Sequence, residues 1–200
     1  MTASYLGLSL FFCSLAGYAF ARLYFPFKLP LFLIMLSSLM IPIHAKIIPL
    51  YLIVHKIHWI NTYHGIVLPF CANTFGIFLM RQYIVASLPS ELLDAARIDG
   101  CSEFMIYIKV VLPLTKPALA TVAIYLGVES WNWFLWPLIV TNNPDLYVLP
   151  IGLANLFDVH RMQYGILMAG AFLAIIPLVT LFLILQWEFI KGIILGAVKG

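Results

Sequence analysis

Long apolar segments constrain this chain of 200 residues more than any other feature of its sequence. A helix rises about 1.5 Å per residue, so roughly 20 residues cross the hydrocarbon core of a bilayer, which is about 30 Å thick. Backbone groups in lipid must bond within their own segment, which makes each span a helix. Segments of this kind occur at residues 3–24, 29–50, 64–86, 117–140 and 164–186. The sequence therefore predicts an all-α membrane protein with about five transmembrane helices.

The shortage of charge agrees with this class. Charged residues make up 10% of the sequence, whereas about 25% is usual in soluble domains. The 11 lysines and arginines are scattered, so we expect a lipid environment and no nucleic-acid partner. No linker or repeat divides the chain, which predicts a single transmembrane domain over residues 1–200. The cysteines form no CxxC pair, and no disulfide framework is expected.

The second apolar segment is interrupted by two prolines, Pro42 and Pro49, with His44 and Lys46 between them. Proline removes a backbone donor from a helix. We therefore expect the membrane part of this segment to end near Pro42, and residues 43–63 to form an interfacial or loop segment.

The stretch 87–116 is too rich in charge to cross a membrane, so we expect a loop outside it. The positive-inside rule assigns this loop to the cytoplasm, together with the C-terminus. One side of the membrane then holds most of the basic residues, Arg22, Lys28, Arg81, Arg97, Lys109, Lys116, Lys191 and Lys199, and the other holds Lys46, Lys56 and Arg161. The N-terminus falls outside without a basic segment to hold it there, so a further span upstream is expected.

Two short helices are predicted in the loop. The first begins at Ser90 and ends or bends at Gly100. The second runs from Ser102 to Leu112 and is closed by Pro113. Its apolar residues follow helical spacing at Phe104, Ile108 and Val111. Periodicity alone is equally compatible with a solvated hairpin that only links two spans.

The spacing of the loop residues is more specific. Asp94-Ala95-Ala96, three residues, Gly100, nine residues and Val110-Val111-Leu112-Pro113 resemble the "EAA" loop of bacterial ABC importer permeases, with Asp for Glu and Val for Ile. The resemblance extends along the chain to Ala19-Phe20-Ala21-Arg22, Phe78-Leu79-Met80-Arg81-Gln82, Trp131-Asn132, Leu135-Trp136-Pro137-Leu138 and Gly196-Ala197-Val198-Lys199-Gly200. The chain is similar to the carbohydrate-uptake branch, which includes the inner-membrane subunits for maltose and related sugars.

This resemblance implies a type I ABC importer transmembrane domain in a bacterial inner membrane. Family members usually have six spans, and this chain begins where their second would begin. The implied partners are a second permease subunit, two cytoplasmic ATPase subunits and an extracytoplasmic solute-binding protein. The implied ATPase-coupling residues are Glu91, Asp94, Ala95, Ala96, Asp99, Gly100, Leu112 and Pro113.

No catalytic residue, metal site or cofactor is expected in this chain. The sequence contains no GxxxxGK[ST] phosphate-binding motif, so ATP is expected to bind to a partner subunit. His55 and His58 could share one helical face, but a metal site needs more ligands than two imidazoles. We interpret these residues, together with His44 and His64, as interfacial histidines.

A carboxylate in the fourth apolar segment is the main candidate for a translocation path. Charge at that depth is costly in lipid, so Glu129 should face a protein interior or a watery path. Glu129, Trp131, Asn132 and Trp133 would offer hydrogen bonds and flat apolar faces to sugar rings. Alternatively, the aromatic residues pack between helices and Glu129 bonds a neighbouring helix.

Several functions remain open from the sequence. The main expectation is a permease subunit that forms the path for a sugar or related solute. The same architecture could import a polyol, glycerol phosphate or a peptide. An intramembrane enzyme that uses Glu129 or the histidines, and a scaffold that docks an ATPase without transport, are the alternatives from other classes.

Overall fold

The computed structural model describes residues 1–156 and 164–197, with side chains up to residue 190. Within these residues the chain is helical and has no strands, which confirms the predicted all-α class. The elements are α1 (Thr2–Arg22), α2 (Lys28–Ser37), η1 (Ser38–Met40), α3 (Ile43–Lys56), α4 (Tyr63–Val67), η2 (Leu68–Phe70), α5 (Thr74–Ser87), α6 (Ser90–Ile98), α7 (Glu103–Ile106), η3 (Tyr107–Val111), α8 (Leu112–Leu114), α9 (Lys116–Trp131), α10 (Leu135–Val140), η4 (Pro144–Leu146), α11 (Leu149–Ala154) and α12 (Tyr164–Ala197).

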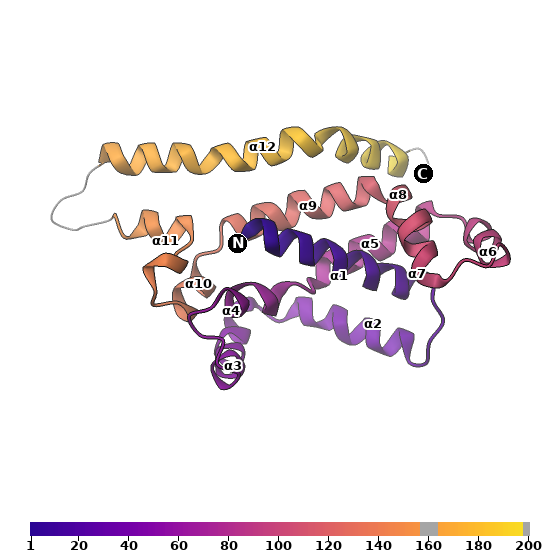
Figure 1. The fold of residues 1–200 in the computed structure, drawn as a ribbon, viewed down its shortest axis with the longest axis horizontal. Helices are drawn as coiled ribbons and strands as arrows, with labels where there is room; N and C mark the ends of the chain where they lie inside the picture. Colours follow the sequence, from indigo (N-terminus) through magenta and orange to yellow (C-terminus); the bar gives the residue numbers. More distant parts are fainter. Residues whose placement is uncertain (157–163, 198–200) are drawn as a thin grey trace.

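The centre of the molecule is a bundle in which α1, α5 and α9 pack against one another. Helix α12 lies along α9, and α2 lies against α5 on the other side of the bundle (Figure 1). Tyr18, Met80 and Leu126 are buried at the centre. The faces of α2 and α12 that point away from the bundle are apolar and exposed, as expected for surfaces that meet lipid or other membrane helices.

A glycine allows α1 and α5 to approach closely. A Cβ at Gly17 would lie 2.6 Å from the Met80 Cβ and 3.1 Å from the Arg81 backbone nitrogen. By contrast, a Cβ at Gly7 on the same helix would meet nothing within 4 Å. Small residues at helix interfaces are a common means of packing helices in membranes.

The substitution Gly17→Ala is expected to destabilise the protein by about 1–3 kcal/mol, because the added methyl group overpacks the α1–α5 contact. Gly7→Ala is the matched control, since it makes the same change in free space and improves helix propensity. Thermal unfolding in detergent measures both. Equal unfolding temperatures for the two variants would contradict the close contact.

Within residues 1–156 and 164–197, three helical segments are long and apolar enough to cross a membrane: Thr2–Arg22, Tyr63–Ser87 and Tyr164–Ile190. Two bent pairs of helices raise the number to five if each pair is one span. They are Lys28–Met40 with Ile43–Lys56, bent by 109°, and Glu103–Leu114 with Lys116–Trp131, bent by 79°.

The bends change two of the predicted segments. The segment 29–50 breaks at Pro42, where we expected its membrane part to end, but residues 43–56 then form helix α3 with Pro49 inside it rather than a loop. His58 lies beyond this helix with a positive φ of 58°, so His55 and His58 do not share a helical face. The segment 117–140 is also divided, because α9 ends at Trp131 and α10 starts at Leu135.

The second loop helix differs from its prediction. Phe104 and Ile108 are 57% and 46% exposed, while Ile106 and Tyr107 are buried with Val111. Residues 107–111 form a π-helical turn, which shifts the buried face away from the spacing of a regular helix.

Pro113 does not close this second helix. It lies inside α8, and the chain bends only at Thr115. The Thr115 hydroxyl donates to the carbonyls of Val111, at 2.9 Å, and Leu112, at 3.3 Å.

The loop lies at the end of the bundle where α1 and α5 finish and α9 begins (Figure 1). At this end Arg22 donates from Nη2 to the carbonyls of Ile84, at 3.3 Å, and of Leu88. A cation at the C-terminus of α5 is favourable for the helix dipole. The predictions that used Arg161, the Lys191 side chain and residues 198–200 lie outside the described residues.

Candidate functional site

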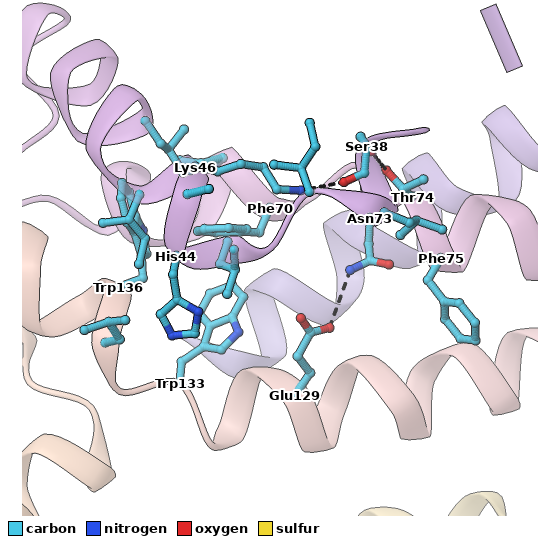
Figure 2. Close-up of a pocket in the computed structure, with 18 of the residues that line it drawn as sticks. Ser38, His44, Lys46, Phe70, Asn73, Thr74, Phe75, Glu129, Trp133 and Trp136 are labelled. Carbon is cyan, nitrogen blue, oxygen red and sulfur yellow. Dashed lines mark hydrogen bonds between the residues drawn. The ribbon is translucent and has the colours of Figure 1, made fainter. Parts of the chain in front are cut away.

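A cavity of about 870 Å³ opens where several helices are interrupted. It is bounded by η1 and α3, by the start of α5, and by the junction between α9 and α10 (Figure 2). Its polar lining includes Ser38, His44, Lys46, Asn73, Thr74, Glu129 and Asn132. Its aromatic lining consists of Phe70, Phe75, Tyr125, Trp133, Phe134 and Trp136.

The interruptions in the helices explain why polar groups gather around this cavity. Pro69 lies at the start of η2, and α5 begins only after Asn73, whose side chain caps the helix by accepting from the Gly76 amide at 3.0 Å. The gap between Trp131 and Leu135 breaks the facing helix. Non-helical backbone at membrane depth is tolerated where it lines a cavity.

Glu129 projects from α9 toward Asn73 (Figure 2). The Asn73 Nδ2 donates to Glu129 Oε2 at 3.4 Å, while its Oδ1 is used by the helix cap. Glu129 thus belongs to the lining of the cavity and also hydrogen-bonds the residue that caps a neighbouring helix. A carboxylate has two acceptor oxygens, so Glu129 can accept hydrogen bonds from a solute in addition to the one from Asn73.

Lys46 is a cation that the sequence analysis placed in an interfacial segment. Its Nζ donates to the Ser38 carbonyl at 2.8 Å, and the Ser38 hydroxyl hydrogen-bonds Thr74 at 3.1 Å (Figure 2). The lysine therefore satisfies a carbonyl near the break at Pro42. A proline and a lysine close together in one apolar segment are the sequence signal that could have placed Lys46 at a cavity.

The two neighbouring tryptophans point to different places. Trp133 lines the cavity and contacts Tyr5 and Phe70, with ring centroids 4.6 and 5.1 Å apart. Trp131 is not in the cavity lining, and its Nε1 donates to the Ala174 carbonyl of α12 at 2.9 Å. Of the four predicted path residues, the structure therefore brings Glu129, Asn132 and Trp133 together and separates Trp131 from them.

This division predicts a structural role for Trp131. Trp131→Phe removes the hydrogen bond to α12, and we expect a loss of about 1 kcal/mol in stability. Solute uptake per folded complex should be unchanged, because the residue does not line the cavity. Thermal unfolding and uptake measured on one preparation test this; lower uptake at unchanged stability would show that Trp131 belongs to the path.

Helix α6 ends in a Schellman motif. Gly100 has a φ of +80°, its amide donates to the Arg97 carbonyl at 3.0 Å, and the Cys101 amide donates to the Ala96 carbonyl at 3.0 Å. This left-handed conformation favours glycine strongly. The structure thus gives a physical reason for the glycine in the loop pattern.

The surface of α6 is largely exposed, and Leu93 is its one buried residue. Leu92 and Ile98 are 43% and 87% exposed, which leaves apolar side chains in the open on a charged helix. The predicted coupling residues of this helix and its final turn are Glu91, Asp94, Ala95, Ala96, Asp99 and Gly100, all exposed except the half-buried Ala96. Leu112 and Pro113 lie apart in sequence on α8, beyond the π-helical turn.

An ion-pair network joins α6 to α7. Arg97 contacts Asp94, with Nη1 and Oδ1 2.6 Å apart, and Glu103, with Nε and Oε1 2.7 Å apart. Hydrogen bonds from Arg97 and then from Tyr18 lower the pKa of Glu103 below its usual value. Glu103 and Tyr18 were missed by the sequence analysis, because no local pattern indicates a contact between residues 85 positions apart.

Comparison with known proteins relates this chain to one family. A family model described as "Binding-protein-dependent transport system inner membrane component" matches residues 13–191. The arabinooligosaccharides transport system permease protein AraQ of Halalkalibacterium halodurans is 46% identical, over 96% of this chain and 69% of the relative. AraQ of Bacillus subtilis is 40% identical, over 96% of this chain and 68% of the relative.

A solved structure is similar over nearly the whole fold. It is a bacterial ABC transporter involved in the import of the acidic polysaccharide alginate, and the match has a TM-score of 0.81 at 26% identity. The match covers 94% of this chain and 71% of the other chain.

Proposed function

Since this chain belongs to the family of binding-protein-dependent transport system inner membrane components, we propose that it is the permease subunit through which an ATP-driven importer moves a sugar oligomer across the inner membrane. The observation that carries this proposal is the cavity at the helix breaks, with Glu129 and Trp133 in its lining. The two AraQ relatives are named for arabinooligosaccharides, which supports a sugar oligomer as the solute.

The cavity has the chemistry that a neutral sugar needs. Aromatic faces such as that of Trp133 suit the apolar faces of sugar rings, and Glu129, Asn132 and Thr74 can bond hydroxyl groups. Its lining contains one lysine, Lys46, and one carboxylate, so the two formal charges cancel. A strongly charged solute would find no matching excess of opposite charge.

The energy source is proposed to be a pair of cytoplasmic ATPase subunits that bind ATP themselves. Their docking surface on this chain is the exposed side of α6, with Leu92 and Ile98 as apolar contacts and acidic residues around them. The proposed arrangement has the C-terminus on the cytoplasmic side, with the ATPase subunits. A second permease subunit completes the path, and an extracytoplasmic binding protein delivers the sugar.

The test is transport by the complete importer in proteoliposomes. ATP-dependent accumulation of a radiolabelled arabinooligosaccharide is expected, and it should stop when the binding protein is omitted or a non-hydrolysable ATP analogue replaces ATP. Radiolabelled sn-glycerol 3-phosphate and a short peptide are the comparison solutes. Accumulation of either in place of the sugar would refute the sugar assignment, while no accumulation of any solute by an intact complex would refute transport.

A further inference from the structure

Helix α6 is joined to the bundle in a way that should let it swing. Its C-terminal turn runs through Gly100 into Cys101 and Ser102, and only Leu93 of the helix is buried. The helix projects beyond the end of the bundle (Figure 1). A projecting helix on a glycine joint would absorb a displacement unless another contact bridged that joint.

Arg97 provides such a bridge. Its guanidinium reaches across the joint to α7, where Nε and Nη2 donate to the two carboxylate oxygens of Glu103 at 2.7 and 3.5 Å. Its Nη1 donates to Asp94 on its own helix at 2.6 Å. A guanidinium with carboxylates on both sides has a defined orientation, because the planar fork fixes the direction of each bond.

The same carboxylate continues into the bundle. Tyr18 of α1 donates from its hydroxyl to Glu103 Oε2 at 2.6 Å, and the tyrosine is only 1% exposed. Tyr107 stacks on Tyr18 with ring centroids 6.0 Å apart, and its hydroxyl hydrogen-bonds Ser14 of α1 at 2.7 Å. The start of the second loop helix is therefore fixed to α1 at two points.

Helix α1 in turn is closely packed on α5. The contact at Gly17 leaves no room for a methyl group beside Met80, and Arg81 donates from Nε to the Phe20 carbonyl at 3.3 Å. At its other end α5 is capped by Asn73, which hydrogen-bonds Glu129 at the cavity. The α1–α5 pair thus extends from the loop to the lining of the cavity.

We propose that Arg97, Glu103 and Tyr18 form a relay that fixes the angle of α6 to α1, so that displacement of α6 moves the α1–α5 pair and with it the cavity. All three are positioning residues, because none lines the cavity. The relay depends on the proposed function, because the proposed ATPase subunit is what displaces α6. Without the relay, ATP would be hydrolysed while part of the motion of α6 was lost at Gly100.

The first experiment measures sugar transported per ATP hydrolysed by the complete importer. Tyr18→Phe is expected to lower this ratio about threefold while the ATPase subunits stay bound, since one hydrogen bond is removed and the ring remains. Glu103→Gln should lower it similarly. The ratio of the double variant should be no lower than that of the more impaired single variant, because the two residues act in one network. Tyr24→Phe, at a fully exposed tyrosine, is the matched control.

Unchanged ratios in both single variants, or losses that simply add in the double variant, would overturn the relay. A second measurement stands apart from transport. Spin labels at Ile98→Cys and Leu8→Cys, in a Cys101→Ser background, report the distance between α6 and α1. The distance distribution should broaden in Tyr18→Phe and not in Tyr24→Phe. Equal widths refute the relay, whereas a wild-type complex that transports no sugar refutes the proposed function and leaves this readout intact.

Discussion

Glu129→Ala is expected to lower ATP-driven sugar uptake about 10- to 100-fold, because hydrogen bonds to a charged group contribute about 1.5–3 kcal/mol and each 1.36 kcal/mol is a factor of ten. Among the described residues that line the cavity, Glu129 is the one carboxylate, and alanine would leave both the solute and Asn73 without this acceptor. Uptake is to be measured per intact complex, with bound ATPase quantified in the same preparation.

Glu129→Gln separates hydrogen bonding from charge. A neutral sugar needs an acceptor rather than an anion, so this variant should keep uptake within about threefold of wild type, a cost of under 1 kcal/mol. Asp145→Asn is the matched control, since Asp145 is exposed and outside the cavity. Normal uptake in Glu129→Ala would remove the residue from the translocation path.

Gly100→Val is expected to lower uptake at least about tenfold, since the left-handed conformation costs an L-residue about 1–2 kcal/mol and is most unfavourable for a β-branched side chain. A Cβ at this position would meet nothing within 4 Å, so within this chain the main effect is on backbone conformation. The C-terminal turn of α6 should reorganise, and less ATPase should remain bound on purification.

The control at this position is Gly100→Asn. Asparagine tolerates positive φ far better than valine, so this variant should retain most of the bound ATPase and most of the uptake. Equal defects in the two variants would mean that side-chain bulk, and not the φ of +80°, limits coupling.

The apolar segments and Gly100 were predictable from sequence because their causes are local. A span is set by its length and hydropathy, and a helix end by one glycine in a favourable place. The end of α9 was not predictable in this way. Residues 132–134, Asn-Trp-Phe, contain no glycine or proline to mark a helix end. Only the packed structure shows that Trp131 turns to α12 while Trp133 turns to the cavity.

The same limit applies to the loop. The spacing of Phe104, Ile108 and Val111 predicts one regular helix, but a π-helical turn interrupts it and Tyr107 is buried. The turn brings the Tyr107 hydroxyl to Ser14, and Glu103 meets Tyr18 beside it. These contacts join distant parts of the chain, so no window of sequence contains them.

The contact between α6 and the ATPase tests the account most directly. A photoreactive amino acid at Ile98, which is 87% exposed, is to be irradiated in the complete importer, with Asp145 as the control site between α10 and α11 at the other end of the bundle (Figure 1). The account predicts an adduct with the ATPase subunit from Ile98 and none from Asp145. An importer that transports sugar but yields no ATPase adduct from Ile98 would contradict it.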